Sequence, residues 1–145
     1  MFSSILPEEF RGEYRPLDNI LQDEQLRLTV RGTMFPTPQN KTLSRDWPQA
    51  RGIFCTNDNS FVVWVNAADH LQVTCLSAGG DLEGIFSKYT RGMNSLERAL
   101  EKNGEKFAFD KRIGYMVSDP KYVGTTLKTT VRLRLPHLLH VSKLC

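Results

Sequence analysis

The alternation of apolar and polar residues predicts three successive strands in the middle of the chain. Residues 50–66, ARGIFCTNDNSFVVWVN, hold two apolar runs separated by Asn57, Asp58 and Asn59, residue types that suit the positive φ of tight turns. A third run, HLQVTCLS at 70–77, follows a second short turn. Consecutive strands joined by such turns pair antiparallel, so this region predicts a group of hairpins.

The clearest helical pattern comes next, in AGGDLEGIFSKYTRGMNSLERALEKNG at 78–104. Asp81 is suited to cap the N-terminus of a helix, and Asn103 with Gly104 is suited to end it. The pattern predicts a helix over 81–103 with an apolar stripe that packs on the core rather than on a partner. The stripe consists of Leu82, Ile85, Phe86, Tyr89, Met93, Leu96 and Leu100.

Weaker patterns predict the remaining elements. Residues 17–32 have apolar positions at helical spacing and end on glycine, which indicates a helix. The other expectations are a Pro-rich connecting loop over 33–49, strands over 112–119 and 128–136, and a short helix over 137–144. Together these elements predict an α+β fold, an antiparallel β-sheet flanked by helices.

Composition narrows the function classes. A chain of 145 residues suits one modest domain or part of a larger one, and its net charge of +3 is spread along the sequence, which does not indicate nucleic-acid binding. No apolar run approaches the roughly 20 residues of a membrane span, and the start lacks the features of a signal peptide. Cys55, Cys75 and Cys145 form neither a metal motif nor a disulfide framework, so we expect a reducing, cytoplasmic location.

Spacing alone identifies no catalytic site. His70, His137 and His140 have no acidic or cysteine partners at ligand spacing, so a metal site is not predicted. Gly79-Gly80-Asp81 could present backbone N–H groups to a phosphate, although a simple tight turn explains it as well. Arg132 and Arg134 alternate along a predicted strand, where they could reach an anion or form a solvated face.

Six motifs, in order, carry a more specific signal. They are RDWPQARGIF (45–54), FVVWVNAADHLQV (61–73), GGDLEGIF (79–86), IGYMVSDP (113–120), GTTLK (124–128) and VRLRLPHL (131–138). Their order and spacing resemble the catalytic domain of the phosphagen kinases, the creatine and arginine kinases (ATP:guanido phosphotransferases). The resemblance covers nearly the whole chain. It implies one partial domain of the glutamine-synthetase/guanido-kinase class, with a helical lead-in and loop over 1–44 and a sheet core over 45–138.

The resemblance makes the turn after FVVWV the critical segment. In the family this turn reads Asn-Glu-Glu-Asp, and its second glutamate holds the substrate guanidinium and is thought to accept its proton. Here Ala68 stands at that position and Ala67 at the position before it. A methyl group can accept neither a proton nor a hydrogen bond, and loss of a positioned base costs roughly 10²–10⁴ in rate. The resemblance therefore assigns no catalytic residue, only the degenerate positions Ala68 and Asp119.

Other family positions also differ. Gln72 replaces an arginine that contacts ATP phosphates, and Asp119 replaces the reactive cysteine that tunes the guanidino substrate. Cys55 and Arg132 stand where the family has histidines near the nucleotide. Lys128 replaces an arginine, keeping the charge without the bidentate fork. Lys128 and Arg132 are thus the candidate nucleotide-binding residues, whereas Cys55 and Gln72 are degenerate nucleotide positions.

Length adds a further expectation. Family members have a small helical domain before the matched region and a segment with another phosphate-binding arginine after it, and 145 residues leave no room for either. We therefore expect exposed sheet edges that a protein partner or a second copy covers, with no nucleic acid and no membrane involved.

Most of the residues that match the family are best interpreted as structural residues: buried aromatic residues, turn residues and residues with special backbone angles. The matching residues are Trp47, Arg51, Trp64, Asn66, Asp69, His70, Gly114, Tyr115, Pro120 and Gly124. The leading hypothesis is a catalytically inactive, phosphagen-kinase-like domain that serves as a structural or interaction module without a cofactor. The alternatives are an active ATP:guanido phosphotransferase fragment, which would use ATP and Mg²⁺, and a nucleotide-sensing domain. A flagellar or ciliary setting is an expectation from the family alone.

Overall fold

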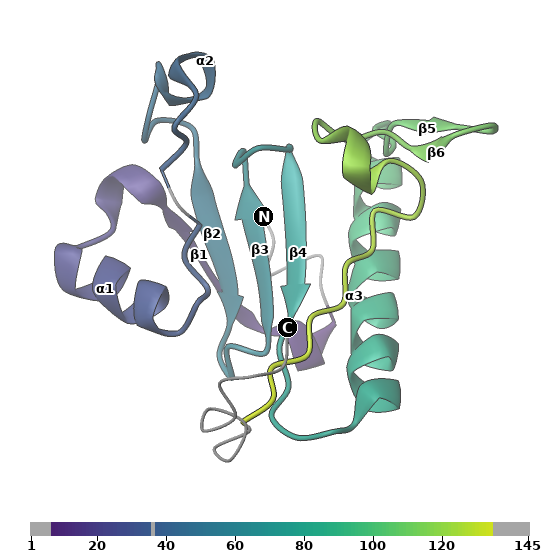
Figure 1. Cartoon of the computed structure of the whole chain (residues 1–145), viewed down its shortest axis with the longest axis horizontal. Helices are drawn as coiled ribbons and strands as arrows, with labels where there is room; N and C mark the ends of the chain where they lie inside the picture. The colour runs from purple at the N-terminus through teal and green to yellow at the C-terminus, as the bar shows by residue number, and fades with distance from the viewer. Residues whose placement is uncertain (1–6, 36, 135–145) are drawn as a thin grey trace, which may run out of the picture. The chain divides into compact units, whose positions relative to one another are not determined.

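The computed structural model describes residues 7–35 and 37–134, which divide between two compact units, one up to Phe107 and one from Ala108 onward. The first unit contains a four-stranded antiparallel sheet in the order β1-β2-β3-β4 (Figure 1). Its strands are β1 (Gly12–Pro16), β2 (Gly52–Thr56), β3 (Phe61–Val65) and β4 (Leu71–Cys75). The sheet and its flanking helices confirm the predicted α+β class.

Strands β2, β3 and β4 confirm the three predicted strands. The β2–β3 turn has Asn59 at a φ of +55°, as its residue types indicate, because asparagine tolerates the left-handed region. The register places Ile53 opposite Trp64 and Trp64 opposite Gln72. Cross-strand partners share a face of the sheet, so these three residues form one row.

Strand β1 is a strand that the apolar pattern does not predict. Its sequence, GEYRP, has no apolar alternation and includes both glycine and proline. It pairs along its whole length with β2, from Gly12 opposite Thr56 to Pro16 opposite Gly52. Backbone pairing at the edge of a sheet tolerates such a sequence, because only one side of the strand needs hydrogen bonds.

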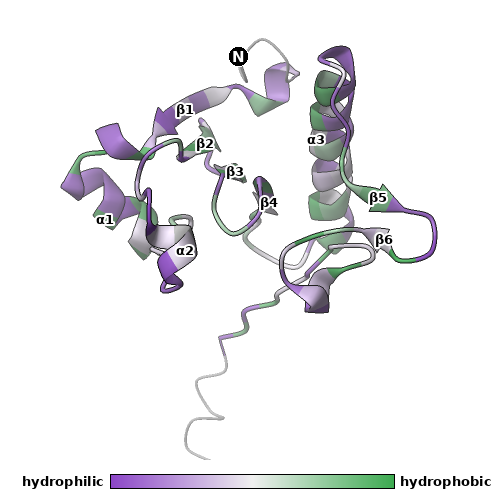
Figure 2. Cartoon of the chain, turned by 90° about the horizontal axis from the view of Figure 1, so that it is seen from above, coloured by the Kyte–Doolittle hydropathy of each residue, from purple (hydrophilic) through white to green (hydrophobic). Residues whose placement is uncertain are grey.

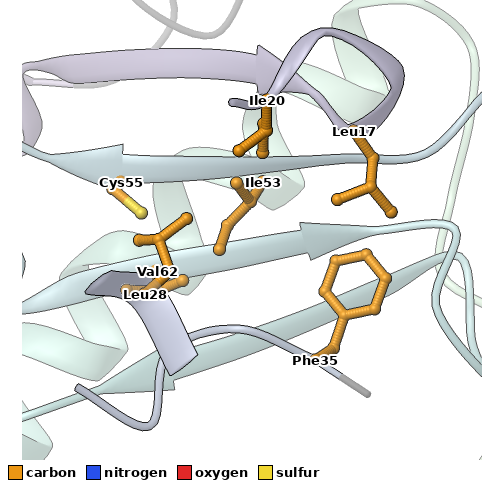
Figure 3. Packing of buried hydrophobic residues seen from close by; sticks show 7 residues of the cluster. All are labelled: Leu17, Ile20, Leu28, Phe35, Ile53, Cys55 and Val62. Atoms are coloured by element: carbon orange, nitrogen blue, oxygen red, sulfur yellow. The ribbon is translucent and has the colours of Figure 1, made fainter. Parts of the chain in front are cut away.

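Two hydrophobic clusters cover opposite faces of this sheet, and in Figure 2 helices α1 (Gln22–Val30) and α3 (Leu82–Lys102) lie on the two sides of the strands. The cluster on the side of α1, here called cluster 1, is drawn in Figure 3 and consists of Leu17, Ile20, Leu28, Phe35, Ile53, Cys55 and Val62. Cluster 2, on the side of α3, consists of Phe10, Phe54, Phe61, Val63 and Leu96. Neighbouring residues of β2 and β3 alternate between the clusters, because successive side chains in a strand point to opposite faces.

The described part of the first 50 residues contains more and shorter helical elements than the sequence pattern predicts. The helix expected over 17–32 is a short 3₁₀ helix, η3 (Leu17–Asn19), followed by α1 (Gln22–Val30). The loop expected over 33–49 contains a single helical turn, α2 (Lys41–Ser44), which Asn40 caps by accepting a hydrogen bond from the backbone N–H of Thr42. Another 3₁₀ helix, η2 (Glu8–Phe10), precedes β1 and places Phe10 in cluster 2.

Helix α3 (Leu82–Lys102) confirms the strongest prediction, including its N-cap at Asp81. The apolar stripe packs on the core only in part. Leu96 is buried, whereas the side chains of Leu82 and Phe86 are 61% and 57% exposed. A helix of 21 residues is about 32 Å long and a five-residue strand about 17 Å, so one end of α3 extends past the sheet.

The second unit has little regular structure. It contains the two-residue strands β5 (Phe109–Asp110) and β6 (Gly114–Tyr115) and the 3₁₀ helix η4 (Pro120–Tyr122). The strand predicted over 112–119 is therefore much shorter than expected. The strand predicted over 128–136 is wrong for residues 128–134, which form no regular secondary structure. The helix predicted over 137–144 lies outside the described residues.

Candidate functional site

The turn between β3 and β4 is held by its polar residues. Asn66 has a φ of +57°, and its backbone N–H donates to the carbonyl of His70 at 2.9 Å. The side-chain amide of Asn66 donates to the carbonyl of Ala50 at 2.9 Å, which ties the turn to the loop before β2. Nδ1 of His70 lies 3.3 Å from Oδ1 of Asn66. Asn66 and His70 thus shape this turn, as their assignment to the fold predicts.

The two alanines of this turn lie in different environments. Ala67 is half-buried and packs against cluster 1, whereas Ala68 is exposed. The position to which the resemblance assigns the catalytic carboxylate is therefore accessible, and the position before it contributes to the core. Neither methyl group supplies an acceptor for a guanidinium or for a proton.

The face of the sheet on the side of α1 carries two of the candidate positions, and a third lies in the turn at the end of β3. Gln72 lies on β4 directly opposite Trp64, and the turn that carries Ala68 begins two residues after Trp64. Cys55 lies opposite Val62, on the same face as Trp64 because both belong to or pack against cluster 1. The first unit thus places Cys55 and Gln72 on one face of its sheet, and Ala68 in the turn that follows β3.

Of these three residues, Cys55 is a core residue. Its side chain is 5% exposed, and burial raises the pKa of its thiol, with the charges of neighbouring groups contributing less. A buried neutral thiol cannot approach a solvated phosphate. Gln72 is exposed and neutral. This face therefore presents no cation at either of the two degenerate nucleotide positions, Cys55 and Gln72.

Trp64 owes its position to structural contacts. Its Nε1–H donates to the carbonyl of Thr33 at 2.6 Å, and its ring lies 5.1 Å from the ring of Phe35. Trp47 also packs against Phe35, edge-on with a centroid distance of 5.5 Å, and the guanidinium of Arg51 lies over the Trp47 ring at 5.2 Å. These aromatic residues join the loop after α1 to the sheet, which supports the interpretation that they stabilise the fold.

The remaining candidates, Asp119, Lys128 and Arg132, belong to the second unit. Asp119 caps η4, because its carboxylate accepts from the backbone N–H of Lys121 at 3.1 Å. It also lies 3.7 Å from Nζ of Lys121. Lys128 places its ammonium 5.9 Å from the centroid of the Tyr122 ring, and Arg132 is exposed. Asp119, the position where the family resemblance expects a cysteine, is thus a capping carboxylate.

Two glycines that match the family allow the second unit to close on itself. Gly114 has a φ of +87°, and a Cβ atom placed on it would lie 2.7 Å from Cα of Gly124. Next to them, the backbone N–H of Tyr115 donates to the carbonyl of Gly124 at 2.8 Å. A side chain at position 114 would push β6 away from the segment that contains Gly124. Both glycines therefore allow a backbone conformation and a close approach that other residues would not.

The Gly79-Gly80-Asp81 segment is a helix start. The carboxylate of Asp81 accepts a hydrogen bond from the backbone N–H of Gly84 at 2.8 Å, so it occupies the end of the helix where an anion would bind. Among residues 7–35 and 37–134, no three His, Cys, Asp or Glu residues gather as a metal site would require. Within the same residues, no helix has the length and apolar character to cross a membrane.

The fold builds one polar network that the sequence pattern does not predict. The Asp58 carboxylate accepts from the hydroxyl of Thr56 at 2.6 Å, from the backbone N–H of Ser60 at 3.1 Å and from Nζ of Lys88 at 3.0 Å. Lys88 belongs to α3, thirty residues away, and also contacts the hydroxyl of Ser60. Only the tertiary structure could reveal this network, which fastens the β2–β3 turn to α3.

Comparison with known proteins agrees with this geometry. The family model for the ATP:guanido phosphotransferase C-terminal catalytic domain matches residues 1–144. Creatine kinase M-type from Torpedo marmorata is 36% identical over 145 residues, covering 97% of this chain and 38% of the relative. Creatine kinase M-type from Homo sapiens is 36% identical over 138 residues, covering 92% of this chain and 36% of the relative.

Solved structures give the same result. The crystal structure of lombricine kinase matches with a TM-score of 0.78 at 29% identity, covering 84% of this chain and 35% of that one. The duplicated taurocyamine kinase from Schistosoma mansoni with bound transition-state-analogue components matches with a TM-score of 0.73 at 29% identity, covering 86% and 18%. The chain thus spans little more than a third of the curated relatives it matches. It belongs to the ATP:guanido phosphotransferase family, the phosphagen kinases, and represents part of their catalytic domain.

Proposed function

We propose that this chain is a catalytically inactive member of its family that acts as a structural or interaction module. The observation that carries the proposal is Ala68. It is exposed on the turn where the family resemblance places the carboxylate that holds the guanidinium and accepts its proton. Phosphoryl transfer relies on positioning and on electrostatic stabilisation, and a methyl group contributes to neither.

Three further positions support the same conclusion. Gln72 brings no charge to a position where the family has a phosphate-binding arginine, and Cys55 is packed inside cluster 1. Asp119 adds a negative charge where the family has a reactive thiol, and this charge is used to cap η4. The residues at these positions do not suit the phosphates of ATP.

A coupled assay with ATP and guanidino compounds tests the proposal. The substrates are creatine, arginine, lombricine and taurocyamine, the last two because the solved relatives are named for them. Creatine kinase assayed in parallel is the positive control. We expect turnover at least about 10⁴-fold below the control, since a base and a phosphate-binding cation are both replaced. Turnover within about tenfold of creatine kinase would refute the proposal.

The single change Ala68→Glu refines this test. We expect it to leave the chain inactive, because Gln72 remains neutral and Asp119 remains acidic. Recovery of substantial transfer activity by this one substitution would show that the rest of the site is intact. The chain would then be an active framework that lacks only its base.

A nucleotide-sensing role is the second candidate, because Lys128, Arg132 and Arg134 are exposed cations close together in the sequence of the second unit. Calorimetry with ADP and ATP separates it from the leading proposal. Micromolar binding without turnover would favour a sensor, whereas no measurable heat supports an interaction module.

A further inference from the structure

We propose that Asn103 is a modification site, where the side-chain amide is lost by ring closure onto the backbone nitrogen of Gly104, and that the C-terminal cap of α3 limits the rate of this deamidation. The product is an aspartate or an isoaspartate at the end of α3. The inference does not depend on whether the chain transfers phosphate. The measurements below and the activity assay above can therefore fail separately.

The sequence places the reactive pair at one position. Asn103 is the only asparagine of the sequence that is followed by glycine. Because glycine has no Cβ atom, its backbone nitrogen is the one that an asparagine side chain approaches most easily. A side chain on the following residue hinders this approach at the other asparagines. The residues that follow them are Ile20, Lys41, Asp58, Ser60, Ala67 and Ser95.

The end of α3 explains why glycine follows Asn103. Gly104 has a φ of +80°, in the left-handed region that favours glycine. Its N–H donates to the carbonyl of Glu101 at 3.0 Å, and the N–H of Glu105 donates to the carbonyl of Leu100 at 3.0 Å. These two hydrogen bonds form a Schellman motif, a common way to end a helix. The cap that ends the helix thus creates the reactive pair.

The same cap holds both reacting groups. Nδ2 of Asn103 donates to the carbonyl of Ala99 at 2.8 Å, which directs the side-chain amide back along the helix. The N–H of Gly104 is bonded to Glu101, as described above. Ring closure needs a free backbone nitrogen and an amide carbon turned toward it. Both hydrogen bonds must therefore open, so the reaction proceeds when the last turn of α3 frays. Each of these contacts lies within residues 99–105 of the first unit.

The reaction needs only water as a co-reactant. The N–H of Gly104 loses its proton to hydroxide, and the nitrogen attacks Cγ of Asn103. The new N–Cγ bond forms, the Cγ–Nδ2 bond breaks, and the leaving nitrogen takes up a proton and departs as ammonia. Water then adds to one of the two carbonyls of the succinimide ring. Opening at one carbonyl gives aspartate, and opening at the other gives isoaspartate. No atom is oxidised or reduced.

Either product weakens the cap. A carboxylate cannot donate to the carbonyl of Ala99, and its negative charge lies at the C-terminal end of α3, where the helix dipole favours cations. Isoaspartate also adds a methylene group to the main chain before Gly104. The variant Asn103→Asp represents the simpler product. We expect the backbone N–H of Glu105 to exchange with solvent about fivefold faster in this variant than in the native chain.

The main experiment follows deamidation of the full chain at neutral pH and physiological temperature. Digestion and mass spectrometry measure the conversion of each asparagine to aspartate and isoaspartate. A peptide with the sequence of residues 98–108 is the reference without a packed helix. We expect Asn103 to convert before every other asparagine. Its rate in the chain should be about tenfold or more below the rate in the peptide, because two hydrogen bonds must first break.

Two variants separate the cap from the reactive pair. Lys102→Gly lowers the helix propensity of the last turn and removes a cation that the helix dipole favours, so conversion of Asn103 should become about fivefold faster. The matched control, Lys106→Gly, changes an exposed lysine beyond the cap and should leave the rate unchanged. Gly104→Asn keeps a residue that tolerates the left-handed region but adds a side chain, so conversion of Asn103 should stop on the same timescale. Circular dichroism shows whether each variant is folded.

Several results would overturn the proposal. One is a native chain without product at Asn103 after many half-lives of the peptide, and another is earlier conversion of a different asparagine. Equal rates in the chain and the peptide would mean that the cap does not limit the reaction. So would a folded Lys102→Gly chain that reacts no faster than the native chain, or a Lys106→Gly chain that reacts as fast as Lys102→Gly.

Discussion

At the scale of single residues, the two alanines of the β3–β4 turn have separate roles. Ala67 is half-buried and, like Trp64, packs against cluster 1. Ala68 is exposed one residue later. The first alanine is part of the packing, whereas the second lies at the surface of the turn.

A matched pair of substitutions tests this distinction. Ala67→Glu should lower the free energy of unfolding by about 1–3 kcal/mol, because it brings a carboxylate against an apolar cluster. Ala68→Glu should change it by less than about 0.5 kcal/mol, since exposed positions tolerate substitution. Urea unfolding monitored by tryptophan fluorescence measures both. Equal losses at the two positions would contradict the assignment of Ala67 to the core.

Asp58 shows how one carboxylate connects a turn to a helix. Partial burial acts to raise its pKa, but the hydrogen bonds from Ser60, Thr56 and Lys88 outweigh this effect and hold the pKa of Asp58 well below its usual value. A carboxylate with a lowered pKa in the folded state stabilises the protein above the pKa of the unfolded chain. That contribution decreases as the pH falls below about 4.

The variant Asp58→Asn should therefore be less stable than the native chain at neutral pH, by about 1 kcal/mol for so exposed a network. The difference should shrink steadily as the pH falls below about 4. Denaturant unfolding at a series of pH values measures it. Asp18→Asn, at an exposed carboxylate without these three donors, is the control. A difference that does not change with pH would mean that the Asp58 charge contributes nothing to stability.

At the scale of elements, the contact between α3 and β3 depends on a glycine in mid-helix. Gly92 is buried, and a Cβ atom placed on it would lie 2.2 Å from Cε2 of Phe61. Phe61 is fully buried in cluster 2 and lies against Phe10 with a centroid distance of 4.7 Å. Close approach of the helix at this point explains a residue that helix propensity alone disfavours.

Replacement of Gly92 by alanine should destabilise the protein, although alanine normally stabilises a helix relative to glycine. Alanine favours a helix over glycine by roughly 1 kcal/mol, yet Gly92→Ala should destabilise the chain by about 1–3 kcal/mol, because Phe61 has no space to move into. Asn94→Ala, at an exposed position of the same helix, should be neutral or stabilising. Thermal unfolding of the two variants provides the comparison. A more stable Gly92→Ala protein would show that α3 can shift away from the sheet.

At the scale of the whole molecule, the chain consists of two compact units, and the boundary between them in the sequence falls between Phe107 and Ala108. The segment before this boundary is exposed from Glu101 to Lys106, and Gly104 has a φ of +80°. Trypsin should therefore cut at Lys106 earlier than at Lys88, whose ammonium is held by Asp58 and whose helix is packed on the sheet. Mass spectrometry of the first fragments measures the order. Earlier cleavage at Lys88 would mean that α3 opens before the connection does.

Much of the fold and part of the site could be predicted from residues close together in the sequence. The three strands at 50–77, the helix at 81–103 with its Asp81 cap and the positive φ of Asn59 all follow from local pattern. The family resemblance correctly identified the class of domain and drew attention to Ala68. Strand β1 could not be predicted, because its sequence has no strand pattern and only its pairing with β2 defines it.

The sequence by itself determined where the hairpins and the long helix form and which candidate positions lack a base or an arginine, because turn chemistry, helical period and residue identity are local properties. Tertiary structure alone decided that Cys55 and Ala67 belong to a core, that Asp58 binds Lys88 across thirty residues, and that Gly92 must be small beside Phe61. It also decided the order of the four described strands, with β1 and β4 at its two ends. These features depend on which residues meet in space, and burial, charge pairing and strand order arise only when distant segments pack together.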